Sequence, residues 1–313
     1  MNNAAGRILI AAALGLSCLV EVACSDAPTS PQSDLRPGAY SADRSEPTFT
    51  IATIDIPGAL ATSPQGINAS GDVSGTYLDV TGRSHGFILH NGAITTIDFP
   101  GADNTDAHGI GPSGDIVGTH WNNGEEAVAF HGYHRSVQGQ FEDVHFPGHL
   151  YEIPQRILPD GRILGCRHDH DLMGSMRGIM ITSTDATETD MFASMNNGAT
   201  PDGAMLVGLY TNMMTTPSRT EAYVIANGEI TPFVVPGSSL TTAWDVNPRG
   251  DIVGVFRDAQ GLHGYVRTDA GYTTISVPGA SATRAFGINA RGDVIGTFVS
   301  GLATHGFLAV RMH

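Results

Sequence analysis

The sequence predicts an all-β fold, and three observations support it. From Thr48 onward a glycine that follows a short polar turn recurs every 42 to 47 residues, six times in all. Each copy contains four short apolar runs bounded by Gly, Pro, Asn or Asp, which is typical of strands. No segment after Thr48 has a sustained apolar stripe at helical spacing. Because four strands in roughly 40–47 residues make one propeller blade, six copies predict a six-bladed β-propeller over residues 48–313. The six turn glycines are Gly71, Gly114, Gly161, Gly203, Gly250 and Gly292.

Three further markers define the repeat. A second glycine follows the turn glycine, usually after four residues: Gly75, Gly118, Gly165, Gly208, Gly254 and Gly296. A Pro-Gly pair ends five segments, at Pro57, Pro100, Pro147, Pro236 and Pro278. A His-Gly-aromatic triplet begins at His85, His131, His263 and His305, and copies three and four carry other residues there. These histidines recur at equivalent positions, so we expect each to make a structural hydrogen bond to a neighbouring loop or strand.

The first copy illustrates the four expected strands. They lie around 66–68, 72–77, 86–89 and 95–99. The repeat begins with a lone fourth-strand segment, Thr53–Pro57, and ends after a third strand at Gly306–Arg311. The first segment therefore supplies what the last blade lacks. We expect the two to pair and close the ring, which removes exposed sheet edges.

These copies resemble the HAF repeat, a bacterial extracellular repeat family. The resemblance covers Thr48 to Arg311 and rests on the His-Gly-aromatic triplets, the Gly-Ile-Asn turns at Asn68 and Asn289, and the Asp-Ile/Val-x-Gly strands. Gly stands here where the family's signature has its central Ala. The resemblance implies an exported protein and supplies no established reaction or catalytic residues.

Composition excludes several classes of function. All 16 basic residues are Arg, so lysine-based Schiff bases, general bases and phosphate loops are excluded. Against 31 acidic residues the formal net charge is -15, the wrong sign for binding nucleic acid or an anionic membrane surface.

The first residues predict export. Arg7 precedes an apolar run, Ile8–Leu19, that is too short to span a bilayer, so residues 1–23 are interpreted as a signal peptide. Cys24 then resembles the lipidated cysteine of a bacterial lipoprotein, although Glu21 departs from that motif; Cys18 is a second candidate, and ordinary secretion is the alternative. We expect the bacterial cell surface, the periplasm or the extracellular space, with any membrane contact made through the lipid.

Residues 24–47, rich in Ser, Pro, Asp and Arg, are expected to form a flexible tether. Cys166 is then the one cysteine of the folded part, so no internal disulfide is expected, and we interpret it as a small strand residue.

Two positions in each copy diverge in a pattern, and they are the candidate ligand contacts. The first position holds Gln65, His108, Gln155, Asn197, Trp244 and Phe286 in the six copies. The second holds Tyr77, His120, Arg167, Tyr210, Phe256 and Phe298. Copies one to four are polar or titratable here, whereas copies five and six are aromatic. If these side chains face a common axial pocket, they suit an amphipathic ligand such as a sugar, a lactone or an aromatic acid. Alternatively they pack between blades.

A divalent metal is the one cofactor that the sequence suggests. On a strand, His168 and His170 would share one face, and His108, His120 or His145 would complete the ligand set. The alternatives are a solvated surface loop and a metal-free functional site.

Methionines crowd into copies three and four. Either they fill an irregular core or they form a soft recognition surface. They are Met173, Met176, Met180, Met191, Met195, Met205, Met213 and Met214.

Three functions remain open. The first is a monomeric, non-catalytic module that binds a glycan, a small molecule or a protein on its ring face. The second is an enzyme. As a lyase it would use Tyr77, His120 or Tyr210 as acid and base, with Arg167 holding a carboxylate; as a lactone or ester hydrolase it would use His108 and His120. The third is a structural spacer of the cell envelope.

Overall fold

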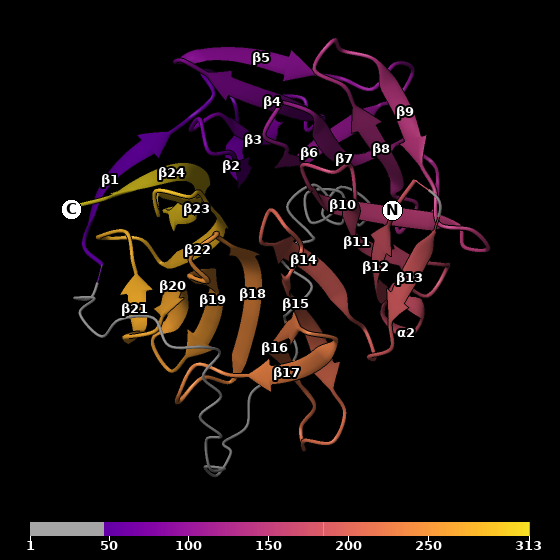
Figure 1. Ribbon diagram of the computed structural model, residues 1–313. Helices are drawn as coiled ribbons and strands as arrows, with labels where there is room; N and C mark the ends of the chain where they lie inside the picture. Colours follow the sequence, from indigo (N-terminus) through magenta and orange to yellow (C-terminus); the bar gives the residue numbers. More distant parts are fainter. Residues whose placement is uncertain (1–46, 184, 313) are drawn as a thin grey trace, which may run out of the picture.

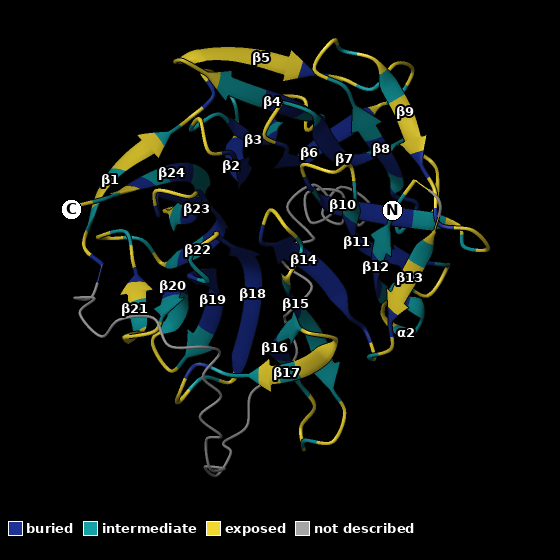
Figure 2. Ribbon diagram, in the orientation of Figure 1, coloured by how far each residue is buried: buried dark blue, intermediate teal, exposed yellow. Residues whose placement is uncertain are grey.

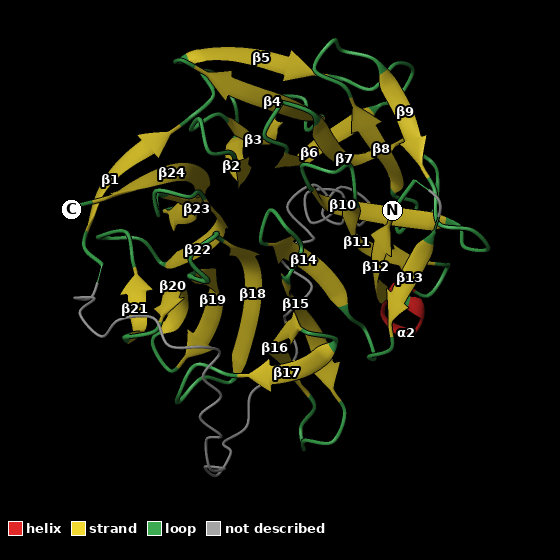
Figure 3. Ribbon diagram, viewed as in Figure 1, coloured by secondary structure: helices red, strands yellow, loops and turns green. Residues whose placement is uncertain are grey.

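The structure, a computed structural model, describes residues 47–183 and 185–312. The expected signal peptide, the lipidation site at Cys24 and nearly all of the expected tether lie outside these residues. The described chain is all-β, as predicted, apart from the four-residue helix α2 (Leu172–Ser175) (Figure 3). Within this part of the chain, no helix has the length and hydropathy of a membrane span.

The strands form four-stranded antiparallel units that follow the repeat. Unit 1 contains β2 (Ala61–Ile67), β3 (Val73–Leu78), β4 (Ser84–His90) and β5 (Ala93–Ile97). Unit 2 contains β6 (Asn104–Ile110), β7 (Ile116–Trp121), β8 (His131–Arg135) and β9 (Phe141–Val144). Unit 3 contains β10 (Tyr151–Ile157), β11 (Ile163–His168), β12 (Arg177–Ile181) and β13 (Ala186–Thr189).

The remaining units have the same order. Unit 4 contains β14 (Met195–Ala199), β15 (Met205–Asn212), β16 (Arg219–Ala226) and β17 (Glu229–Phe233). Unit 5 contains β18 (Leu240–Val246), β19 (Ile252–Asp258), β20 (Gly261–Thr268) and β21 (Gly271–Ile275). Unit 6 contains β22 (Ala282–Ile288), β23 (Val294–Ser300), β24 (Ala303–Arg311) and β1 (Phe49–Ile54).

The units are arranged around a common centre, with their first strands innermost and their fourth strands outermost (Figure 1). Burial follows this order (Figure 2). Every residue of β6 and of β18 is buried, whereas β5 is exposed at all positions but its last. The inner strands begin earlier than the sequence predicts, because residues 61–65 of β2 lack any alternating pattern and are nevertheless extended and mostly buried. A strand covered on both sides has no polar face to reveal it.

The N-terminal strand belongs to the last unit. β1 pairs antiparallel with β24 from Phe49 opposite Arg311 to Ile54 opposite Gly306. A single parallel bridge, Ala61 to Thr304, joins β2 to β24 beside it. On the opposite side of the sheets, Nη1 of Arg291 donates to the carbonyl oxygen of Ala69 at 2.8 Å. Units 6 and 1 are therefore in direct contact, although they lie at the two ends of the repeat.

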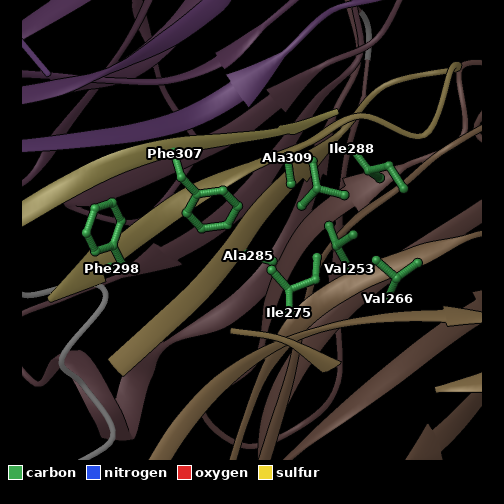
Figure 4. Packing of buried hydrophobic residues seen from close by; sticks show 9 residues of the cluster. Val253, Val266, Ile275, Ala285, Ile288, Phe298, Phe307 and Ala309 are labelled. Atoms are coloured by element: carbon green, nitrogen blue, oxygen red, sulfur yellow. The ribbon is translucent and has the colours of Figure 1, made fainter. Parts of the chain in front are cut away.

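Close packing within each unit explains two of the sequence markers. A Cβ atom added to Gly254 would lie 1.9 Å from the carbonyl oxygen of Thr242 and 2.7 Å from the ring of Tyr265. The second glycine therefore leaves room for the aromatic residue of the triplet, whose hydroxyl donates to that same carbonyl at 3.0 Å. In unit 6 the aromatic residue is Phe307, which is fully buried among apolar side chains of units 5 and 6 (Figure 4).

A threonine holds the connection between successive units, and the sequence analysis missed this marker. The backbone N–H of Ile56, just before a Pro-Gly pair, donates to Oγ1 of Thr62 at 3.0 Å. The same bond links Phe99 to Thr105 at 2.9 Å. It recurs between Val235 and Thr241 and between Val277 and Thr283. In unit 3 a glutamate replaces the threonine, and Oε1 of Glu152 accepts from the N–H of Phe146 at 2.8 Å.

The two sides of the sheets differ in what joins the strands. Because neighbouring strands run antiparallel, the loops between second and third strands and the connections between units lie on one side, here called the connecting-loop face. The turns between first and second and between third and fourth strands lie on the other, the turn face.

Substituting two glycines separates lack of space from backbone conformation. We expect Gly254→Ala to destabilise the protein by at least about 3 kcal/mol, since its Cβ would collide with backbone. Gly250→Ala should cost only about 1 kcal/mol, because Gly250 has φ +81° but nothing within 4 Å of an added Cβ. Urea unfolding of both variants measures the difference, and equal costs would contradict the packing explanation.

Candidate functional site

The first divergent position forms a ring on the innermost strands. In every unit this residue is the extra residue of a β-bulge in the first strand. His108 Nδ1–H donates to the carbonyl oxygen of Pro154 at 2.7 Å, and Asn197 Nδ2 donates to that of Ala243 at 2.8 Å. Both side chains thus form a hydrogen bond to the inner strand of the next unit.

The ring is packed rather than open. The rings of Trp244 and Phe286, in units 5 and 6, meet edge to face with centroids 5.1 Å apart. Five of the six side chains are buried, and Gln65 is partly buried with Nε2 donating to Ser63 Oγ at 2.8 Å. These contacts favour the packing alternative for Gln65, His108, Gln155, Asn197, Trp244 and Phe286.

The residue after each bulge reveals a feature that the sequence analysis missed. Four units have glycine there, whereas unit 3 has Arg156 and unit 5 has Asp245. Nη2 of Arg156 donates to the carbonyl oxygen of Phe286 at 2.8 Å and to that of Gln65 at 3.2 Å, and lies 3.4 Å from Oδ2 of Asp245. One buried guanidinium therefore joins unit 3 to units 1, 5 and 6. Burial raises the pKa of Asp245, and the Arg156 charge opposes that rise.

The second divergent position does not converge on a site. Its residues lie on the second strands, opposite the first residue of each triplet. Tyr77 stacks on His85 with ring centroids 5.0 Å apart, Phe256 lies 5.3 Å from His263, and Phe298 lies 5.1 Å from His305. These side chains form ladders within their own sheets.

The four residues of the lyase hypothesis each contact a different partner. Tyr77 contacts Thr96 through its hydroxyl at 3.1 Å, and His120 stacks on Phe99 at 3.7 Å. Nη2 of Arg167 donates to Oε2 of Glu188 at 2.7 Å, while the Tyr210 hydroxyl donates to Oε2 of Glu221 at 2.7 Å. Across the residues that the structure describes, no hydrogen bond, ion pair or ring contact joins any two of the four.

The expected metal site is not formed. His168 Nε2–H donates to the carbonyl oxygen of Val128 at 2.7 Å, and His170 Nδ1 lies 2.7 Å from Oε1 of Glu126. Two of the three candidate third ligands bond elsewhere, His108 to Pro154 and His145 to Glu152 at 3.2 Å. The third, His120, stacks on Phe99. No three His, Cys, Asp or Glu side chains in the described ranges are placed to share a metal ion. The expectation fails because strand β11 ends at His168, so the alternation of side chains between the two faces of the strand does not extend to His170.

Two other sequence interpretations are confirmed. The first holds for three of the four triplet histidines, which bond to the end of the fourth strand: His85 Nδ1 to Asp98 at 2.7 Å, His305 Nδ1 to Asp55 at 2.9 Å and His263 Nδ1 to Ser276 Oγ at 3.1 Å. His131 departs from this pattern, and its Nε2 lies 3.5 Å from Oε1 of Glu125 in the β7–β8 loop. Cys166 is a buried strand residue, and burial raises the pKa of its thiol far above the ordinary value.

A cluster of titratable side chains does assemble where two irregular loops meet. The β7–β8 loop (residues 122–130) and the β11–β12 loop (residues 169–176) both lie on the connecting-loop face, in units 2 and 3. Oε1 of Glu126 accepts hydrogen bonds from the Tyr151 hydroxyl and from His170 Nδ1. The Tyr151 ring centroid lies 5.5 Å from that of His168 and 5.5 Å from that of His131. We call Glu126, His131, Tyr151, His168 and His170 the histidine–tyrosine cluster.

Local packing fixes the two loops. Phe130 at the end of the first loop is buried, and its carbonyl oxygen accepts from the N–H of Glu152 at 3.2 Å. The second loop contains α2, whose N-cap is Asp171: Oδ1 of Asp171 accepts from the N–H of Gly174 at 3.0 Å. The backbone that carries the cluster is therefore supported, even though all of its side chains except buried His168 reach the surface.

The electrostatics of the cluster favour binding over nucleophilic chemistry. The hydrogen bond to Glu126 raises the pKa of Tyr151 to about 12, and that same bond lowers the pKa of Glu126. Burial lowers the pKa of His168. At neutral pH the cluster thus presents a carboxylate, a phenol, a neutral buried imidazole and the exposed imidazole of His170.

Comparison with known proteins identifies the fold and not the function. Neither a protein-family model nor a curated protein sequence matches this chain. Among solved structures, TolB from Acinetobacter baumannii is similar at 14% identity with a TM-score of 0.52, covering 73% of this chain and 55% of that chain. A putative TolB from Agrobacterium tumefaciens is similar at 12% identity with a TM-score of 0.52, covering 80% and 90%. A streptogramin B lyase matches at 17% identity over 84% and 98%, with a TM-score of 0.44.

The two TolB similarities show a propeller-like all-β fold.

His108, in the ring on the inner strands, should make the stability of the protein depend on pH. Burial lowers the pKa of His108 from 6.5 to about 4, so the folded state holds this imidazole neutral. The stability that this provides is complete above pH 6.5 and is lost as the pH falls towards 4. His108→Asn places at this position the residue that unit 4 uses for the same bond. Between pH 6.5 and pH 4 the free energy of unfolding should fall in both proteins. We expect the fall to be smaller in the variant than in the wild type, by about 2 to 3 kcal/mol. Urea unfolding at both ends of the window measures this, and parallel pH profiles would contradict it.

Proposed function

We propose that this protein is a non-catalytic binding module that holds its ligand on the connecting-loop face, with the histidine–tyrosine cluster as the polar centre of the site. The observation that carries this proposal is the meeting of two irregular loops, which brings Glu126, Tyr151 and His170 into mutual contact. Insertions in repeat proteins commonly map to loops on the binding face. Most other divergent side chains with described contacts serve packing or pair within their own sheets.

The distribution of exposed apolar side chains supports the same face. Eight large apolar residues in loops of the connecting-loop face are exposed. At the turn-face end of the described sheets five are exposed: Val137 in a turn, Met312 after β24, and Ile94, Ile230 and Val310 near strand ends. Apolar surface gathered on one side of a soluble protein marks an interaction site. The eight are Leu60, Val80, Leu150, Met173, Phe192, Met213, Met214 and Leu302.

The enzymatic alternative has less support. A lyase needs its base and its carboxylate-binding arginine around one substrate, yet Arg167 is paired with Glu188 and Tyr210 with Glu221. A hydrolase using His108 would need a side chain that is buried and bonded to Pro154. Binding requires neither rearrangement.

The architecture and location complete the proposal. We infer a single closed ring of six blades, in which β1 completes the last blade through its pairing with β24. A signal peptide over residues 1–23, lipid attachment at Cys24 and a HAF-type extracellular role remain part of this proposal. In that setting the connecting-loop face would meet a ligand outside the cytoplasm, a small molecule, a glycan or a protein.

Variants of the cluster test the site. Glu126→Gln, Tyr151→Phe and His170→Ala should each weaken binding of the ligand by about tenfold, since each removes one hydrogen-bonding group from the cluster. Screening of neutral and uronic-acid glycans, lactones and synthetic peptides by biolayer interferometry supplies the ligand, and the variants are then compared by calorimetry.

His90→Ala is the matched control. His90 is also an exposed histidine paired with a carboxylate, at 2.6 Å from Asp72, but it lies beside the turn face. The control should bind as the wild type does. Absence of any wild-type binding, equal affinity of all four variants, or turnover of a screened compound would overturn the proposal.

A further inference from the structure

An exposed apolar surface adjoins the histidine–tyrosine cluster in units 3 and 4. Its members come from the connection between units 2 and 3, from α2, from the β13–β14 connection and from the β15–β16 loop. Met214 is 93% exposed and Met213 59%. We call this surface the methionine–phenylalanine patch; it comprises Leu150, Met173, Phe192, Met213 and Met214.

Hydrogen bonds and a cation–ring contact link these segments into one surface. The N–H of Leu150 donates to Oδ1 of Asp169 at 3.1 Å, and the N–H of Asp169 donates to Oγ of Ser175 in α2 at 2.8 Å. The guanidinium of Arg177, just after α2, lies 5.8 Å from the ring centroid of Phe192.

The β15–β16 loop follows directly. The N–H of Thr211 donates to the carbonyl oxygen of Phe192 at 3.0 Å, so the end of β15 lies against the β13–β14 connection. The N–H of Met214 donates to Oδ1 of Asn212 at 2.9 Å, which ties the loop to its own backbone. The methionine side chains therefore project from a supported loop instead of filling the core, unlike Met176 and Met195, which are buried.

Carboxylates accompany the apolar residues of the patch. Asp171 precedes Met173 by two residues, and Asp190 precedes Phe192 by two. Both aspartates are exposed, and neither forms an ion pair within the described part of the chain. Within the same part of the chain, the ion-pair partner of Glu126 in the cluster is a histidine, His170. Of the two nearby arginines, Arg167 is neutralised by Glu188, whereas Arg177 donates only to carbonyl oxygens and keeps its positive charge beside Phe192. The three carboxylates outnumber that one charge.

We propose that the occupant of this surface is a peptide segment that carries both apolar and cationic side chains. This inference rests on the proposed function and specifies its ligand. Apolar side chains of the segment would pack on the methionines and on Phe192, since flexible thioethers adapt to varied shapes. Its arginine or lysine groups would meet Asp171, Asp190 and Glu126, which supplies charge complementarity. An anionic ligand such as a uronic-acid glycan would be repelled by the same groups.

Synthetic peptides test this assignment directly. The probe is a short fluorescent peptide in which Arg and Leu alternate, measured by anisotropy against the wild-type protein. One comparison peptide has Glu in place of Arg, and another has Ser in place of Leu. We expect the first peptide to bind, with an affinity that falls as salt is added, and both comparison peptides to bind at least about tenfold more weakly.

Protein variants locate the binding. Met213→Ser/Met214→Ser should weaken binding of the Arg-Leu peptide about tenfold, and Asp171→Asn/Asp190→Asn should weaken it several-fold while reducing its salt dependence. Val137→Ser, an exposed apolar residue of the turn face, is the matched control and should leave the affinity unchanged.

The failures of the two proposals are distinguishable. If the Arg-Leu peptide does not bind, or binds equally well to the Met213→Ser/Met214→Ser variant, the peptide assignment is overturned. If in addition a glycan or small molecule binds and depends on Glu126, the binding module stands with a different ligand. If no ligand depends on either the cluster or the patch, both proposals fail.

Discussion

The whole arrangement depends on one buried ion pair at the centre of the molecule. Six inner strands approach one another so closely that four of them carry glycine after the bulge; a Cβ on Gly198 would lie 2.6 Å from Cα of Asp245. In the gap that remains, Arg156 reaches the carbonyl oxygens of Phe286 and Gln65 and the carboxylate of Asp245. A buried guanidinium is tolerated only when it is hydrogen-bonded and paired, so these partners hold units 1, 3, 5 and 6 in one register.

The contacts further from the centre recur in most units, and this recurrence distinguishes the scaffold from the candidate site. Threonine bonds hold four of the connections between units, and arginines of the turn face link neighbouring turns, as Arg249 does through the carbonyl oxygen of Ala290. Such contacts consume the polar groups that recur in the repeat. Loop residues of the connecting-loop face that differ from the repeat do not have these scaffold roles and are available to bind a ligand. They are concentrated in units 2 to 4, where the loops are longest.

The sequence predicted the repeat correctly because its markers are steric. A glycine that must admit an aromatic ring, such as Gly254 beside Tyr265, tolerates no substitute and is therefore visible at a fixed spacing. The candidate sites were predicted less well. Divergence at Trp244 and Phe286 reflects packing against the next unit, and divergence at Arg167 reflects its pairing with Glu188. The cluster around Glu126 depends on two loops that meet in space, which no spacing encodes. One signal was available: Arg156 in unit 3 and Asp245 in unit 5 carry opposite charges at the position where the other four units have glycine.

A double-mutant cycle on Arg156 and Asp245 tests the central pair most directly. The variants Arg156→Met, Asp245→Asn and the combination of both are compared with the wild type by urea unfolding at neutral pH. The account predicts that Arg156→Met alone costs about 3 to 5 kcal/mol, because it leaves a buried carboxylate without its partner. It also predicts that the combined variant costs less than the two single costs together by at least about 1.5 kcal/mol. Costs that add to within about 0.5 kcal/mol would contradict it, because the two side chains would then act independently.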